Sequence, residues 1–289
     1  MPREVLEYLA PEAGQIVVEA TVGGGGHARL IAERLGPTGR LIGLDQDPAM
    51  LELARPVLDC LPVTLVHANF DQLRHVLDAQ RVSAADAVLA DLGFSSDQLA
   101  DPERGLSFQQ PGPLDMRLDP TQGEPASALL HRLNERELAN LIYLYGEERL
   151  SRRIARRVIE VRRTSRIETT EQLAELVRGC VPRSRGHAID PATRTFLALR
   201  IAVNDELGAL DRLLTALPRC VKPGGRAVII SFHSLEDRRV KQAFRDKQTW
   251  GALTRKPIQA SEEEVRNNPR ARSAKLRAAL RLRLSDEIR

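Results

Sequence analysis

Short apolar runs alternate with amphipathic segments through the first third of the chain. Four of these runs are typical of buried strands, and the three segments between them have helical periodicity. In chain order the expected elements are strand 16–21, helix 28–35, strand 41–45, helix 48–58, strand 63–67, helix 70–79 and strand 87–91. This βαβαβαβ order predicts an α/β fold with a parallel sheet and helices on both faces.

The alternation stops near residue 95 and resumes only after residue 202. Residues 101–125 are rich in glycine and proline, and the pattern that follows is mostly helical. Strand character returns at 226–231, and period-two alternation at 274–282 predicts a last strand whose basic face looks outward. We therefore expect a discontinuous sheet domain, 1–95 with 203–289, and an inserted helical domain, 96–202, that recognises the substrate.

A turn made only of glycines joins the first strand to the first helix. Gly23 to Gly26 allow bare backbone to approach a ligand at the positive end of that helix. The second strand ends on Asp45, where an acid can accept hydrogen bonds from both hydroxyls of a ribose. This pattern fits NAD and S-adenosylmethionine (SAM) equally well. A tight turn without a ligand is the structural alternative.

Further candidate residues lie at the same edge of the predicted sheet. Asp91 ends the fourth strand, at the edge where open α/β sheets bind ligands, although it could simply cap the next turn. Phe70 follows the third strand and could lie against an adenine, or could belong to the core. His27 begins the first helix and could contact the ligand through its backbone N–H, or be an ordinary surface histidine.

One predicted helix of the insert has an arginine face. The arginines recur at helical spacing opposite an apolar stripe, which favours a phosphate backbone as partner over a merely solvated face. The face comprises Arg149, Arg152, Arg153, Arg156 and Arg157, and Arg183, Arg185 and Arg194 are among the residues that extend it.

Composition narrows the possible function classes. The 289 residues carry a formal net charge of +4, so nucleic acid remains open as a partner. Aromatic residues make up 3% of the chain, which disfavours a surface that binds single strands through many stacked bases. Three cysteines without metal-ligand spacing predict no disulfide framework and no metal site, and fit the cytosol. No apolar run is long enough to span a membrane.

The segment 231–238 combines serine, histidine and acids, as hydrolases do. It lacks the G-x-S-x-G elbow, and three groups within a few residues of one turn do not build a catalytic triad. A loop that faces the substrate is the better interpretation.

Taken together, the motifs resemble the RsmH (MraW) family of bacterial SAM-dependent 16S rRNA cytosine-N4 methyltransferases, over nearly the whole chain. The matching segments are 21–27 (TVGGGGH), 91–99 (DLGFSSDQL), 102–108 (PERGLSF), 112–120 (GPLDMRLDP), 145–149 (YGEER), 191–196 (PATRTF), 230–238 (ISFHSLEDR) and 268–273 (NPRARS).

The resemblance implies a cytoplasmic enzyme with a class I SAM-methyltransferase fold, Rossmann-like, and an inserted helical domain. Its substrate would be a cytidine in the decoding region of 16S rRNA, within the small ribosomal subunit, and a homodimer is left open. By position, the SAM contacts would be Gly25, Gly26, His27, Asp45, Phe70, Asp91 and Gln98. The loop His233 to Arg238 would join the arginine helix in binding phosphates, and Asp237 within it is a further candidate RNA contact.

This chain departs from the family pattern in two places. Glu19-Ala20-Thr21 stands where the family has an acid, glycine and threonine. Family members also typically begin with a His-x-Pro-Val-Leu segment, and this chain starts just after it, so we expect that the start is internal and that substrate contacts from that segment are missing.

The implied reaction is displacement at the sulfonium methyl group by the exocyclic N4 of cytosine. Asp91, or a backbone carbonyl of Leu92-Gly93, would accept an N4 hydrogen as the bond forms. Two alternatives from other classes remain: an NAD-dependent oxidoreductase, and a ribosome-assembly factor that binds RNA without catalysis. The methyltransferase alone accounts for the glycine turn, Asp91, the insert and the arginine helix together.

Overall fold

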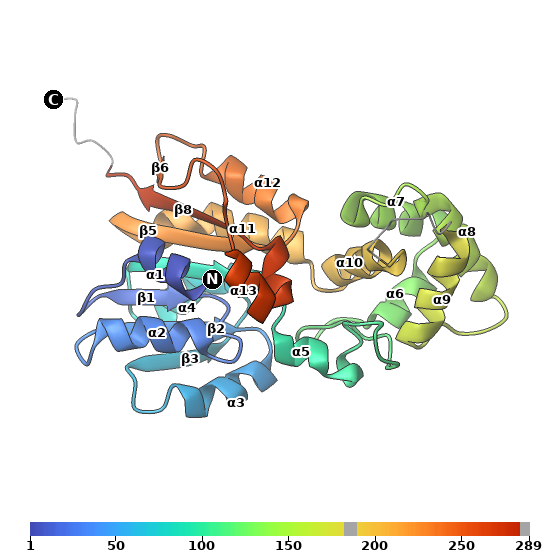
Figure 1. Ribbon diagram of the computed structural model, residues 1–289, viewed down its shortest axis with the longest axis horizontal. Helices are drawn as coiled ribbons and strands as arrows, with labels where there is room; N and C mark the ends of the chain where they lie inside the picture. The colour runs from blue at the N-terminus through green and yellow to red at the C-terminus, as the bar shows by residue number, and fades with distance from the viewer. Residues whose placement is uncertain (182–189, 284–289) are drawn as a thin grey trace. The chain divides into compact units, whose positions relative to one another are not determined.

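The computed structural model describes residues 1–181 and 190–283 (Figure 1). It separates into two compact units. The sheet unit consists of Met1–Gly93 and Leu207–Arg289, and the helical unit is Phe94–Glu206. The sequence predicted an insert at 96–202, which ends inside helix α10 (Ala192–Val203), whereas the structure changes unit after that helix, before Leu207.

The sheet unit is built on one mixed sheet with strand order β3-β2-β1-β4-β5-β8-β6 and β7 beside β8. Strands β1 to β5 run parallel, and β8 pairs antiparallel with β5, β6 and β7. The predicted α/β class and its parallel core are therefore confirmed. The strands are β1 (Ile16–Glu19), β2 (Arg40–Asp45), β3 (Val63–His67), β4 (Ala85–Asp91), β5 (Val221–Ser231), β6 (Trp250–Ala252), β7 (Ile258–Gln259) and β8 (Lys275–Arg281).

Helices cover both faces of this sheet. On one face Val17 and Leu41 pack with Ile31 of α2, and on the other Val18 packs with Leu213 of α11. The alternation of side chains along each strand thus separates two hydrophobic layers. The helices of the sheet unit are α1 (Pro2–Leu9), α2 (Gly26–Leu35), α3 (Pro48–Val57), η1 (Phe70–Gln72), α4 (Leu73–Ala79), α11 (Glu206–Cys220), α12 (Ser234–Ala243), α13 (Glu262–Asn267) and η3 (Pro269–Ser273).

The last strand corrects one expectation from the sequence. Its basic residues were predicted to face outward, but Arg277 of β8 is 7% exposed. Its guanidinium donates hydrogen bonds to the Asp237 carboxylate of α12, with the nearest nitrogen 2.7 Å from Oδ1. The prediction was wrong because β8 is an interior strand, flanked by β5 and β6 and covered by helix α12, so its charged face needs a buried partner.

The helical unit has a hydrophobic core of its own, which includes Leu114, Leu138, Ile154 and Leu199. Helices α7 and α10 approach closely because Gly146 has no side chain: a Cβ there would lie 2.4 Å from the carbonyl oxygen of Arg194. Besides α10, the helices of the unit are α5 (Ser96–Ala100), η2 (Pro102–Arg104), α6 (Ala126–Arg132), α7 (Glu135–Gly146), α8 (Ser151–Val161) and α9 (Thr170–Cys180). Across the described residues, no helix is both long and apolar enough to cross a membrane.

Candidate active site

The glycine turn lies between the end of β1 and the start of α2. Gly23 and Gly25 both have positive φ, 53° and 86°, a region that favours glycine. Gly25 is the N-cap residue of α2 and so precedes the free N–H groups of its first turn. A Cβ at Gly26 would have no atom within 4 Å, so open space lies over the start of this helix. The backbone is thus accessible to a ligand where the helix end is positive.

Asp45, at the end of β2, holds the glycine turn in place. Its Oδ2 accepts a hydrogen bond from the Gly23 N–H at 2.8 Å, and its Oδ1 accepts one from the Asp47 N–H at 2.9 Å. Burial raises the pKa of the Asp45 carboxyl, although these backbone donors oppose that rise. The sequence placed Asp45 correctly at the edge, and its contact with a ribose stays a prediction.

Asp91 ends β4 and lies beside His27 of α2. The Nε2 of His27 is 3.6 Å from Oδ2 of Asp91, and the Asp91 N–H donates to Oγ1 of Thr21 at 2.7 Å. Oδ1 of Asp91 is buried and accepts no hydrogen bond in the described structure. Two of the predicted site residues, from different elements, are thus adjacent, and one carboxyl oxygen is left for a ligand.

Glu19 is the residue at this edge that the sequence analysis did not select. It is the last residue of β1, it is 1% exposed, and its Oε2 has no hydrogen-bond partner among the described residues. Burial, followed by the charges of Asp91 and Asp45, raises the pKa of its carboxyl well above the ordinary value. An acid that ends an otherwise apolar strand was the available signal.

Two other predicted cofactor contacts, Phe70 and Gln98, make contacts within the protein itself. Phe70 begins η1 and packs, half-buried, against the core of the sheet unit. Gln98 lies in α5 of the helical unit, where its Oε1 accepts a hydrogen bond from the Ser95 N–H at 2.8 Å as part of a capping box. Their roles toward a cofactor stay predictions.

Four of the five arginines of the predicted face lie on α8. All five, Arg149 to Arg157, are exposed, but the helix begins at Ser151, so Arg149 lies in the turn before it. Ile154 and Val158 of the opposite stripe are buried in the helical unit. Arg156 lies 3.6 Å from Glu135 and Arg157 lies 3.3 Å from Glu160, so acids partly neutralise one end of the face. Arg149, Arg152 and Arg153 have no ion pair in the described part of the chain. Arg194, in α10, lies 3.7 Å from Glu148, and Arg183 and Arg185 are outside the described residues.

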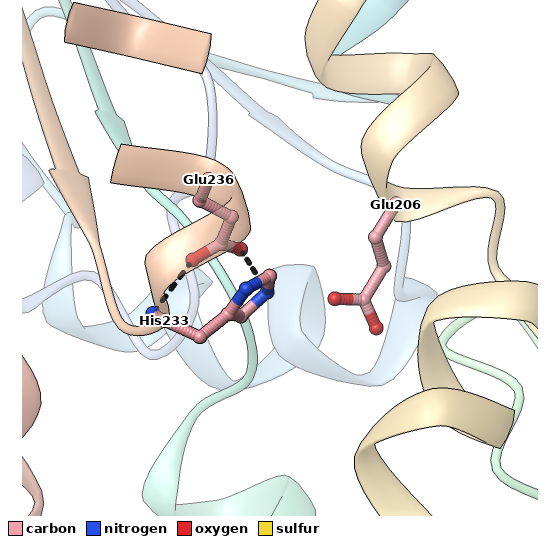
Figure 2. Close-up of side chains that lie close together, drawn as sticks. All are labelled: Glu206, His233 and Glu236. Carbon is pink, nitrogen blue, oxygen red and sulfur yellow. Dashed lines mark hydrogen bonds and ion pairs between the residues drawn. The ribbon is translucent and has the colours of Figure 1, made fainter. Parts of the chain in front are cut away.

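The loop after β5 was expected to face the substrate, but the side chains of His233 and Glu236 are 11% and 3% exposed. His233 lies beside Glu236 of α12, with 3.2 Å between Nε2 and Oε1, and the other carboxyl oxygen of Glu236 accepts a hydrogen bond from the His233 N–H (Figure 2). The same oxygen also accepts one from the Phe232 N–H. Asp237 is engaged by Arg277. These contacts fix the start of α12, and RNA contacts from this loop, Arg238 included, stay predictions.

Comparison with known proteins decides the family. The model of the MraW methylase family matches residues 1–282. The chain belongs to the MraW methylase family. A relative from Sorangium cellulosum, named "Ribosomal RNA small subunit methyltransferase H", is 50% identical over 282 residues, covering 97% of this chain and 89% of the relative. A relative of the same name from Geobacter sulfurreducens is 48% identical over 304 residues, covering 98% and 97%.

Two solved structures align with most of this chain at low sequence identity. An rRNA methylase from Streptococcus thermophilus aligns with a TM-score of 0.44 and 11% identity, covering 98% of this chain and 94% of that one. A fibrillarin from Aeropyrum pernix, in complex with natively bound S-adenosyl-L-methionine, aligns with a TM-score of 0.42 and 9% identity, covering 93% of this chain and 67% of that one.

The family match makes this protein a SAM-dependent methyltransferase, and its α/β sheet unit agrees with the class I fold that the resemblance to the family implies. The strand ends of the sheet unit fit that cofactor. The glycine turn exposes backbone N–H groups, and the buried free oxygens of Glu19 and Asp91 suit a cationic ligand. The alternative of an NAD-dependent oxidoreductase is not supported by the family match.

Proposed function

We propose that this methyltransferase acts on ribosomal RNA of the small subunit, at the exocyclic N4 of a cytidine in the decoding region. The observation that carries the proposal is the match to curated small-subunit rRNA methyltransferases along nearly their whole length. The exposed arginines of α8 add a surface of the charge that a phosphate backbone requires. We further propose that the enzyme works in the cytoplasm; a homodimer stays an open prediction.

The cofactor-binding residues that we propose come from the ends of four strands and from the short helix α5. Backbone N–H groups at Gly25, Gly26 and His27 would face the cofactor, and Asp45 would accept hydrogen bonds from ribose hydroxyls. Phe70 would lie against the adenine. Asp91 and Gln98 complete the proposed set.

When bound, SAM supplies an electrophilic methyl group. Cytosine N4 is a poor nucleophile because its lone pair is delocalised into the ring, so the protein must orient the base and accept an N4 hydrogen. Asp91 is the residue that we propose for this acceptor, since its Oδ1 is buried and free of hydrogen bonds in the described structure. The His27 ring beside the other oxygen would hold the carboxyl group in that orientation.

The target base has to leave its stack before N4 can reach a methyl donor at the strand ends. We propose that the arginines of α8 hold the flanking phosphates during this step, with Arg194, His233 and Arg238 as further phosphate contacts. Asp237 stays a candidate contact to other groups of the RNA. Phosphate contacts position the RNA without reading its sequence, so the choice of base would come from the site itself.

Transfer of labelled methyl groups tests the proposed substrate class. Purified protein is incubated with labelled SAM and either small or large ribosomal subunits from cells that lack this enzyme. We expect label in the RNA of the small subunit only. Label in the large subunit, or RNA binding without any transfer, would contradict the proposal, and the second result would favour an assembly factor.

A further inference from the structure

Three acids at the strand ends of the sheet unit point to the same face of the sheet. Side chains alternate along a strand, so Glu19 shares a face with Val17, Asp45 with Leu41 and Asp91 with Leu89. The three apolar residues belong to one buried cluster, which also contains Ile31 of α2. The three carboxyl groups therefore lie on the side of the sheet that α2 covers.

The strand register places Glu19 between the two aspartates. Glu19 pairs with Gly43 of β2 on one side and with Leu89 of β4 on the other. Asp45 and Asp91 each lie two residues further along their strands, which is one step of the pleat. Glu19 is thus recessed behind a pair of acids, at the bottom of the edge where the glycine turn begins.

The charges around Glu19 are predominantly negative. Asp45 faces it from β2 and Asp91 faces it from β4, and both disfavour its ionised form. His27, from α2, lies at ion-pair distance from Asp91, while Asp47 acts on Asp45. No lysine or arginine is among the causes that shift the pKa of Glu19. A carboxylate there would be buried to 99%, beside two other acids and without a hydrogen bond on Oε2.

We propose that Glu19 carries a proton in the free protein and releases it to solvent as the positively charged cofactor binds. The inference rests on SAM as the cofactor, whose sulfonium and ammonium groups bring positive charge to this edge. Binding exchanges one proton for one cation, so the recessed carboxyl group becomes a carboxylate only when a countercharge is present. Cofactor affinity then increases as pH rises from the pKa of Glu19 in the complex to its raised pKa in the free protein.

Titration calorimetry in buffers of different ionisation enthalpy measures the proton directly. For wild-type protein we expect the apparent binding enthalpy of SAM to vary with the buffer, because binding releases protons, up to one per cofactor, at pH values below the raised pKa of Glu19. For Glu19→Gln, which keeps the shape but has no proton to release, the buffer dependence disappears and the affinity falls. If Glu19→Gln keeps the wild-type proton release, another group, such as the buried Asp45, is the source and the proposal is overturned.

A neutral ligand is the matched control. Methylthioadenosine has the adenosine and the sulfur of SAM without its charges, so we expect it to bind wild-type protein with no proton release. Release of a proton with this ligand would also overturn the proposal, since the exchange would not depend on a cation.

Infrared spectroscopy of the free protein provides a readout that needs no ligand. We expect a protonated-carboxyl band near neutral pH that Glu19→Gln removes and that SAM removes from wild type. If SAM binds but the band is absent, this inference fails and the cofactor stands. If the band is present and SAM does not bind at all, the cofactor assignment fails and the proton exchange fails with it.

Discussion

At the residue scale, the site is a set of carboxyl groups with different tasks. Asp45 holds the glycine turn, Asp91 lies beside His27, and Glu19 is recessed between them. The positions of Asp45 and Asp91 could be predicted from the sequence because acids at the ends of parallel strands meet at one edge. Glu19 also ends an apolar strand, but its burial between Asp45 and Asp91 depends on strand register, which the local sequence does not show.

Replacing Asp45 tests its contact with the cofactor. We expect Asp45→Ala to weaken SAM binding by about 1.5 to 3 kcal/mol, the usual range for hydrogen bonds to a charged group. Part of this loss would come from release of the Gly23 N–H, which Asp45 now holds. Calorimetry measures the affinity, and an unchanged value would remove Asp45 from the site.

The pKa of Glu19 also predicts a pH dependence of stability. Because its pKa is raised in the folded protein, the folded state binds more protons than the unfolded state above pH 4.5, and stability falls as pH rises through that window. We expect ligand-free Glu19→Gln to lose this part of the decline and to be more stable than wild type near neutral pH. Urea unfolding at a series of pH values measures the free energy of unfolding of the two proteins. If that free energy varies with pH in the same way for both, the raised pKa of Glu19 is contradicted.

At the element scale, the glycine turn and α2 together form the proposed binding site for the cofactor, and the sequence predicted both elements. The positive φ of Gly25 and the open space over Gly26 explain why this turn consists of glycines. Helix α8 was also predicted, from its arginine face and its apolar face. The partial neutralisation of its arginines by acidic residues was not predicted. Glu135 comes from a different helix, α7, so its approach to Arg156 is invisible in the local pattern.

Alanine at the two adjacent glycines should separate folding from binding. Gly25→Ala places a side chain at a positive φ, and we expect it to lower the free energy of unfolding by about 1 to 2 kcal/mol. Gly26→Ala meets no atom within 4 Å, and helix propensity predicts a gain of up to about 1 kcal/mol. Its methyl group occupies the space over the helix start, so SAM binding should weaken. Gly26→Ala with full SAM affinity would contradict the proposed approach of the backbone to the cofactor.

The unpaired arginines of α8 predict a salt-dependent loss of RNA binding. We expect Arg152→Ala with Arg153→Ala to weaken binding to small subunits and to reduce its salt slope by about 2, one for each phosphate contact. Arg55→Ala is the matched control, because Arg55 is exposed near the end of α3 and pairs only with Glu52 in the described structure. Equal losses in the control and the double variant would argue against α8 as the RNA surface.

At the scale of the whole molecule, the sheet unit is formed by two separate stretches of sequence, and the helical unit is inserted between them. The interruption of strand periodicity predicted this organisation. It could not locate the second boundary, since α10 continues through residue 202 with unbroken helical periodicity. The prediction that the basic face of β8 points outward was wrong for a related reason. The period of a strand shows which residues share a face, but not that a helix covers that face.

The chemical identity of the product tests the central claim most directly. After methyl transfer from labelled SAM to small subunits that lack the modification, the rRNA is digested to nucleosides and separated. We expect label in N4-methylcytidine, which identifies donor, acceptor atom and substrate together. Label in any other nucleoside, with wild-type protein that binds SAM, would contradict it.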